Sequence, residues 1–282
     1  LSFMRILTRR MTRENWTFTR PVFEFDDKGV GHAVYCARTP DRTYSLIAFG
    51  HDLPAEQRSD RVIAEAWDAT FALFDGIPEE ADIDRLSRNV PLQEAGRVSE
   101  REFVLSRANR SVRLFKYVVD RLAAGEQPDP AQIDPVGYLM RTTAVYGSGK
   151  LGAADREMIA DRPEFAAPFQ VEMLSVFLTR AFVRDLAQHM AHARGGAATA
   201  TLDPDIARSM GIGNSTGLGM APFLLNHPRL INNWIAARET AIARVRALPT
   251  ATREETALVG ELLERSVLSA DLWHATHPSQ IE

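Results

Sequence analysis

Met173-Leu-Ser-Val-Phe-Leu-Thr-Arg-Ala-Phe-Val183 is the stretch that decides the fold, because its apolar side chains fall nearly all round a helix. A helix that is hydrophobic on every side must be buried. Arg162-Pro163 supplies a start signal upstream, and Gly195-Gly196 supplies a stop signal after Arg194. The sequence therefore predicts a long helix, from about residue 163 to 194, that runs through the centre of the protein.

The first fifty residues predict strands instead. Bulky and polar residues alternate over 16–25, and turn residues follow at Asp26-Asp-Lys-Gly29. Two further segments of strand character span 32–37 and 43–49, with a second turn between them. We expect a three-stranded antiparallel meander that ends near residue 52.

Helix signals dominate the rest of the chain. Ser59–Phe74 has apolar residues at helical spacing, and Ser99-Glu-Arg-Glu102 is a capping box for a helix to about Ala124. Further helix starts are predicted at Asp134-Pro135, Asp203-Pro204, His227-Pro228 and Thr252-Arg-Glu-Glu255.

These signals predict about eight helices against three strands. The expected fold is mainly α with a small N-terminal antiparallel β-meander, which is α+β by strict definition. We expect residues 1–52 to form the meander and to pack on a helical domain of residues 53–282, the two making one compact unit.

Composition excludes some functions. The 282 residues have a formal net charge of −4, which argues against a nucleic-acid-binding surface. The single cysteine, Cys36, cannot form an intrachain disulfide. No apolar run approaches the roughly 20 residues that a membrane helix needs. We therefore expect a cytoplasmic protein with no nucleic-acid and no membrane partner.

The first candidate site is the glycine-rich stretch Gly211-Ile-Gly-Asn-Ser-Thr-Gly-Leu-Gly219. Exposed backbone N–H groups in such a loop, where it enters a helix, can bind an anion. The predicted contacts are Asn214, Ser215, Thr216 and Gly217. The alternative is a helix-to-helix turn in which Asn214 or Ser215 caps the next helix.

Residues 213–217 also match the Gly-x-Ser-x-Gly pattern of a nucleophile elbow, with Ser215 as the nucleophile. Asp271 and His274 follow in the right chain order for an acyl-transfer triad. An elbow requires a buried strand immediately before the serine, however. The polar residues and helix-start signals of 203–210 predict no strand there, which argues against a serine hydrolase.

A second glycine-rich turn, Tyr146-Gly-Ser-Gly-Lys-Leu-Gly152, resembles half of a phosphate-binding loop. Ala144 stands where such a loop requires glycine, and Leu151 stands where it requires serine or threonine. Lys150 could still hold a carboxylate or phosphate as a point charge, or could simply be solvated. We expect the two glycine-rich loops to form opposite walls of one pocket.

Two further groups could bind ligands. Arg107 and Arg110 lie at i and i+3 of a predicted helix, so both could reach one anion or could form a solvated basic edge. Asp185, His189 and His192 share one helix face and could give a metal three ligands. Ligands on one helix lie along a line rather than converging, and the helix dipole alone favours histidines in a last turn.

The leading hypothesis is a small-molecule-binding protein, most simply an enzyme, that acts on an anionic carboxylate or phosphate metabolite through its glycine-rich loops. Ser215 or a histidine would then serve as acid or base, and no residue pattern identifies a cofactor. A non-catalytic helical assembly protein is the alternative, with a homodimer or partner surface rich in aromatic residues. Those residues are Trp67, Phe71, Phe165, Phe169 and Trp234. A third hypothesis is a metal-dependent hydrolase built on His189 and His192.

Overall fold

The computed structural model describes residues 7, 10–57, 66–88, 99–142, 156–214, 240–241, 243–244, 247 and 252–276. The chain forms two compact units that divide between Ile231 and Asn232. The larger unit contains the sheet and its helices. The smaller unit contains one long helix, α9 (Arg253–Thr276).

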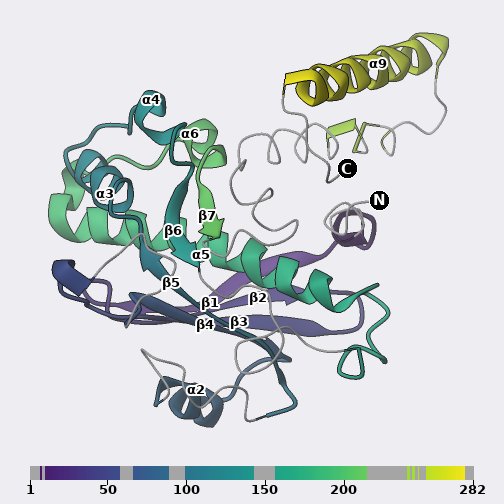
Figure 1. The fold of residues 1–282 in the computed structure, drawn as a ribbon. Coiled ribbons are helices and arrows are strands. Elements are labelled where there is room, and N and C mark those ends of the chain that lie inside the picture. Colours follow the sequence, from purple (N-terminus) through teal and green to yellow (C-terminus); the bar gives the residue numbers. More distant parts are fainter. Residues whose placement is uncertain are drawn as a thin grey trace. The chain divides into compact units, whose positions relative to one another are not determined.

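The larger unit is built on a seven-stranded sheet whose strands lie in chain order and curl around a central helix (Figure 1). The first six strands pair with their neighbours in antiparallel fashion, and the seventh strand runs parallel to the sixth. The strands are β1 (Thr17–Phe25), β2 (Gly31–Arg38), β3 (Thr43–Gly50), β4 (Ala69–Asp75), β5 (Glu102–Arg110), β6 (Tyr138–Thr142) and β7 (Gly211–Asn214).

The sheet corrects the expectation of a mainly α protein. The predicted meander is confirmed as β1 to β3, but it continues into four more strands. Residues 69–74 and 102–110, both predicted as helix, lie in β4 and β5. Both strands are buried on both faces, so they lack the polar alternation that identified the meander. An all-α description is therefore wrong.

Two of the predicted helix starts are confirmed and one is wrong. Asp203 caps α6 (Pro204–Arg208) as expected, accepting a hydrogen bond from the Asp205 N–H at 2.7 Å. The capping box at Thr252 is confirmed, because Glu255 Oε2 accepts from the Thr252 N–H at 2.8 Å. The predicted helix start at Asp134 is wrong, because Asp134 follows the end of α4 (Pro130–Ile133) as its C-cap.

The central helix is confirmed as α5 (Pro168–Gly195), which starts a few residues later than predicted. Leu174, Phe182 and Leu186 are buried between it and the sheet. Helix α3 (Phe115–Ala123) packs beside it, and η1 (Ala55–Gln57) and η2 (Gly196–Ala198) are short 3-10 turns. On the other face of the sheet, α2 (Glu80–Ser87) covers a second, smaller apolar cluster (Figure 1).

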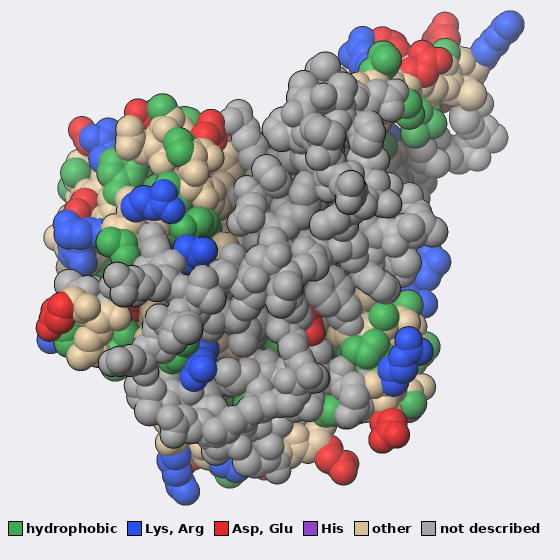
Figure 2. Space-filling view, in the orientation of Figure 1, with side chains coloured by type: hydrophobic (Ala, Val, Ile, Leu, Met, Phe, Trp, Pro, Cys, Tyr) green, Lys and Arg blue, Asp and Glu red, His purple; other side chains and the backbone are tan. Residues whose placement is uncertain are grey.

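Acidic and basic side chains are interspersed over the described part of the face in Figure 2, rather than gathered by sign. The helices within the described ranges are all too short or too polar to cross a membrane.

Candidate anion-binding cleft

A cleft of about 310 Å³ opens where the β1–β2 turn, the ends of β3 and β5 and the last turns of α5 meet. This volume is at the lower end of the range for small-molecule sites, roughly 300–1,000 Å³. Three cations and two carboxylates line the cleft, and a methionine and an alanine give it an apolar wall. The lining residues are Asp27, Lys28, Asp52, Arg110, Met190, Ala193 and Arg194.

Arg110, the last residue of β5, is the buried cation of the cleft. Its Nη2 donates to the backbone oxygens of Lys28 at 3.2 Å and of His51 at 3.4 Å. Its Nε lies 3.9 Å from Oδ1 of the fully buried Asp68, which also accepts from the Arg110 N–H at 2.9 Å. These contacts fix the guanidinium before any ligand arrives.

The β1–β2 turn forms one rim of the cleft, and the sequence correctly predicts a turn there. Asp26 Oδ1 accepts from the backbone N–H groups of Val30 at 2.8 Å and Lys28 at 2.9 Å. The hydrogen bond from Val30 is the largest effect that lowers the pKa of Asp26. The turn exposes Lys28, whose Nζ lies 3.8 Å from Oδ2 of Asp52.

The opposite rim is the last turn of α5. Arg194 Nη1 donates to Oδ1 of Asp120 on α3 at 2.8 Å, and both side chains are 44% exposed. Exposed ion pairs contribute little stability, about 0–1 kcal/mol. Lys28 and Arg194 can therefore leave their partners for a bound anion at small cost.

His51, whose backbone oxygen accepts from Arg110, is a partly buried neighbour of the cleft. Burial, with the nearby positive charge of Arg110, lowers the pKa of His51 to about 4. The imidazole is therefore neutral near neutral pH. Its Nε2 is buried and has no hydrogen-bond partner in the described part of the chain.

The structure changes the interpretation of Arg107 and Arg110. They lie on a strand rather than a helix, and residues three apart on a strand point to opposite faces. The Arg107 guanidinium lies over the ring of Trp67 at 4.7 Å, whereas Arg110 lines the cleft. The helix on which the predicted convergence of both arginines was based is therefore a strand.

The glycine-rich loops fall largely outside the described residues, and so do Lys150, Ser215, Thr216 and Gly217. Asn214 ends β7, and only its backbone is described. Thr142 and Asn214 are register partners in the parallel pair β6–β7. The two loop sequences thus both follow the carboxyl ends of adjacent parallel strands, the edge at which open α/β sheets bind ligands.

The expectation that no strand precedes Ser215 is wrong. Gly211, Ile212 and Gly213 are buried in β7, which ends immediately before the serine. The helix-start signal at Asp203 does produce a helix, but α6 is only five residues long and leaves room for the strand. The pattern of residues 213–217 therefore has the buried strand that an elbow requires on its N-terminal side.

The three predicted metal ligands on α5 are engaged separately. Asp185 Oδ2 accepts from Arg20 Nη1 at 2.8 Å and from the Tyr35 hydroxyl at 2.7 Å. His189 Nε2 lies 2.9 Å from the Asp26 backbone oxygen, and His192 is exposed. Among the described residues, no three His, Cys, Asp or Glu side chains are grouped so that they could hold a metal.

Three of the five aromatic residues that we expected on a partner surface are buried in the core. Trp67, Phe71 and Phe165 are 2%, 0% and 5% exposed. The Phe169 side chain and Trp234 lie outside the described residues. The three buried rings are therefore not available to a partner.

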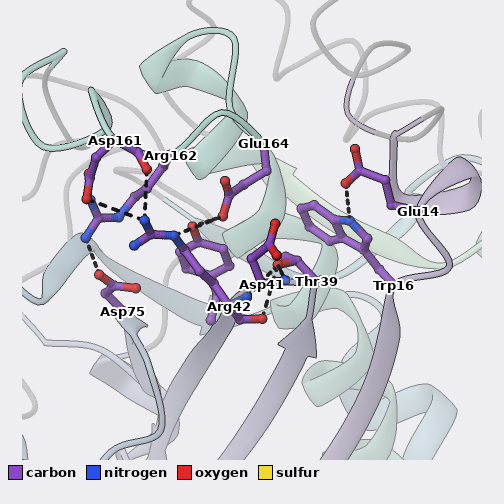
Figure 3. Close-up of polar contacts among 10 residues, drawn as sticks. Glu14, Trp16, Thr39, Asp41, Arg42, Asp75, Asp161, Arg162 and Glu164 are labelled. Atoms are coloured by element: carbon purple, nitrogen blue, oxygen red, sulfur yellow. Dashed lines mark hydrogen bonds and ion pairs between the residues drawn. The ribbon is translucent and has the colours of Figure 1, made fainter.

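A second polar cluster, shown in Figure 3, joins residues 161–164 to β4 and to the start of β3. Tyr44 donates to Oε1 of the buried Glu164, and burial together with Glu164 raises the pKa of Tyr44. Arg42 Nη2 donates to the Asp161 backbone oxygen at 2.9 Å, and Arg162 pairs with Asp75. The carboxylates of Asp75, Asp161 and Glu164 each have an arginine or tyrosine partner, so we interpret the cluster as structural.

The chain matches no family model, and comparisons with curated proteins and with solved structures also give no match. Function is therefore inferred from the geometry of the sites.

Proposed function

We propose that the protein binds a small anionic metabolite, a carboxylate or a phosphate, in the cleft beside Arg110. One observation carries the proposal: a buried guanidinium, fixed by two backbone carbonyls, lines a cleft of about 310 Å³. Arginine presents a planar fork of N–H donors that matches carboxylate and phosphate oxygens. A fixed fork binds with little loss of entropy.

The rim of the cleft supports the same class of ligand. Lys28 and Arg194 lie on opposite sides and are exposed enough to move toward a bound anion. Met190 and Ala193 give an apolar surface for the carbon skeleton of a metabolite. The proposal concerns binding, and we assign no reaction to the cleft.

The test is calorimetric titration of the whole chain with phosphate, citrate and nucleotides, each also examined by thermal shift. A ligand at 100 times its dissociation constant should add about 2.7 kcal/mol to the free energy of unfolding. We expect Lys28→Gln and Arg194→Gln each to weaken binding by roughly 3- to 10-fold, as loss of about 1 kcal/mol implies.

Arg121→Gln is the matched control, because Arg121 is an exposed arginine of α3 that pairs with Glu126 and does not line the cleft. It should leave the affinity unchanged. If no anion binds the wild type, or if all three variants bind equally well, the cleft is not the site.

Acyl transfer at Ser215 is a second candidate function, and the buried strand β7 directly before this serine favours it. A fluorophosphonate probe should then label the protein once, and mass spectrometry should locate the adduct on Ser215. Ser215→Ala should abolish labelling, whereas Ser209→Ala should not. An unlabelled wild type would exclude an activated serine.

A further inference from the structure

Arg180 and Arg184 lie one helical turn apart on α5, and neither forms an ion pair in the part of the chain that the structure describes. Arg180 Nε donates to the Met210 backbone oxygen at 2.7 Å. Its Nη2 donates to the backbone oxygens of Ala207 at 3.0 Å and Arg208 at 3.3 Å. Arg180 is thus held by the end of α6, whereas Arg184 has no such contact.

Arg184 is a partly buried cation. Its Nε is buried and has no hydrogen-bond partner in the described residues. The neighbouring carboxylate, Asp185, already accepts from Arg20 and Tyr35. The two guanidinium groups of Arg20 and Arg184 thus lie near this one carboxylate, and Arg20 is the one that pairs with it.

The positive charges of Arg180 and Arg184 repel one another. Burial, and then the positive charge of Arg184, lower the pKa of Arg180 to about 9. Burial also lowers the pKa of Arg184, and Asp185 offsets this only in part. Buried charges in proteins are normally paired, because removing an unpaired charge from water is costly. The missing partner here would be negatively charged.

We infer that Arg184, with Arg180 beside it, binds an oxyanion, a phosphate or a carboxylate, at a second site on α5. The guanidinium of Arg184 would supply the N–H donors, and Arg180 would add positive charge while holding the end of α6 in place. This site is distinct from the cleft. Its nearest cleft residue on the helix is Met190, six residues further on, which corresponds to about 9 Å along the axis.

The test is titration of the whole chain with inorganic phosphate, and separately with citrate, in wild type, Arg184→Gln and Arg208→Gln. Arg208 is an exposed arginine of the same region that pairs with Asp205, so its variant controls for loss of one positive charge. We expect Arg184→Gln to weaken one class of sites at least tenfold and Arg208→Gln to leave it unchanged. Comparison of the two titrations identifies phosphate or carboxylate as the preferred anion.

The cleft variant Lys28→Gln separates the two sites, because it should leave the Arg184 site intact. Thermal melting without added anion gives an independent readout. A partly buried cation whose Nε has no hydrogen-bond partner among the described residues predicts that Arg184→Gln melts at the same temperature as wild type or higher. The inference is overturned if Arg184→Gln melts several degrees lower, or if it keeps every phosphate site that the wild type has.

Discussion

A Cβ atom on Gly29 would lie 2.9 Å from Nη2 of Arg110 and 2.9 Å from Sδ of Met190. Gly29 also has a φ of +79°, a conformation that side chains with a Cβ rarely adopt. The backbone of the β1–β2 turn therefore requires glycine at this position, and an added Cβ would also displace the ends of the Arg110 and Met190 side chains.

Gly29→Ala should destabilise the protein by about 1–3 kcal/mol, because it combines backbone strain with a steric clash. It should also weaken anion binding, since Arg110 must move away from the cleft. Urea unfolding and calorimetric titration measure the two effects. Gly260→Ala is the control, because a Cβ on Gly260 in α9 would meet no atom within 4 Å. A folded Gly29→Ala protein with unchanged affinity would contradict the role of Arg110.

His51 should make stability depend on pH. Its pKa is lowered from the ordinary 6.5 to about 4 in the folded protein by burial, with a contribution from Arg110. Between these two values the unfolded chain binds a proton that the folded chain does not. The free energy of unfolding should therefore rise with pH through this window and level off above it. With a discount for solvent screening, the contribution is on the order of 1–2 kcal/mol.

His51→Gln isolates this effect, because the other titratable groups are the same in both proteins. Urea unfolding at several values between about pH 4 and pH 7 should give a smaller increase of stability with pH for the variant. Parallel curves for wild type and variant would show that His51 is protonated equally in the folded and unfolded states.

The pair of Asp75 and Arg162 should stabilise the fold more than exposed pairs do. The two side chains are only 19% and 14% exposed, and the Arg162 guanidinium lies over the Phe103 ring at 5.0 Å. Asp75→Asn should cost about 1–3 kcal/mol, because it leaves a half-buried guanidinium with a weaker partner. A double-mutant cycle with Arg162→Gln gives the coupling energy. Lys116→Gln breaks the exposed pair with Asp120 and should cost less than about 0.5 kcal/mol.

Some parts of this fold can be predicted from the sequence because their signals are local. Strands β1 to β3 have turn residues between them, and α5 is apolar over three turns. The short strands β6 and β7 have no such signal, since five and four residues show no period. They exist because β5 offers an edge to β6, and β6 then offers an edge to β7. That relationship is long-range.

The lining of the cleft likewise depends on long-range contacts that local sequence signals do not reveal. Lys28 lies in a turn that the sequence predicts, but its neighbours Asp52 and Arg194 come from elements far apart in the chain. Only the packing of α5 against the ends of β3 and β5 brings them together. The sequence predicts Arg110 as an anion ligand. It also predicts Arg107 as the second ligand, but that prediction depends on a helix, and the segment is a strand.

Gly213 of β7 lies close against the ring of Tyr138 on β6, within the parallel pair. A Cβ atom on Gly213 would lie 2.8 Å from Cγ and Cδ1 of the tyrosine ring. The ring cannot move aside easily, because Tyr138 is 8% exposed and its hydroxyl accepts from Arg113 Nη2 at 3.0 Å. Gly213→Ala should therefore destabilise the larger unit by about 1–3 kcal/mol, as overpacking of a core does.

Urea unfolding of Gly213→Ala, Tyr138→Leu and the double variant tests this contact. Tyr138→Leu alone should be destabilising, because it removes a buried ring and its hydrogen bond. In the double variant the smaller leucine leaves room for the new methyl group, so the two losses should sum to less than additivity predicts. Strict additivity, or a Gly213→Ala protein as stable as wild type, would mean that the ring does not lie against β7. The parallel pairing that places Ser215 after a buried strand would then be in doubt.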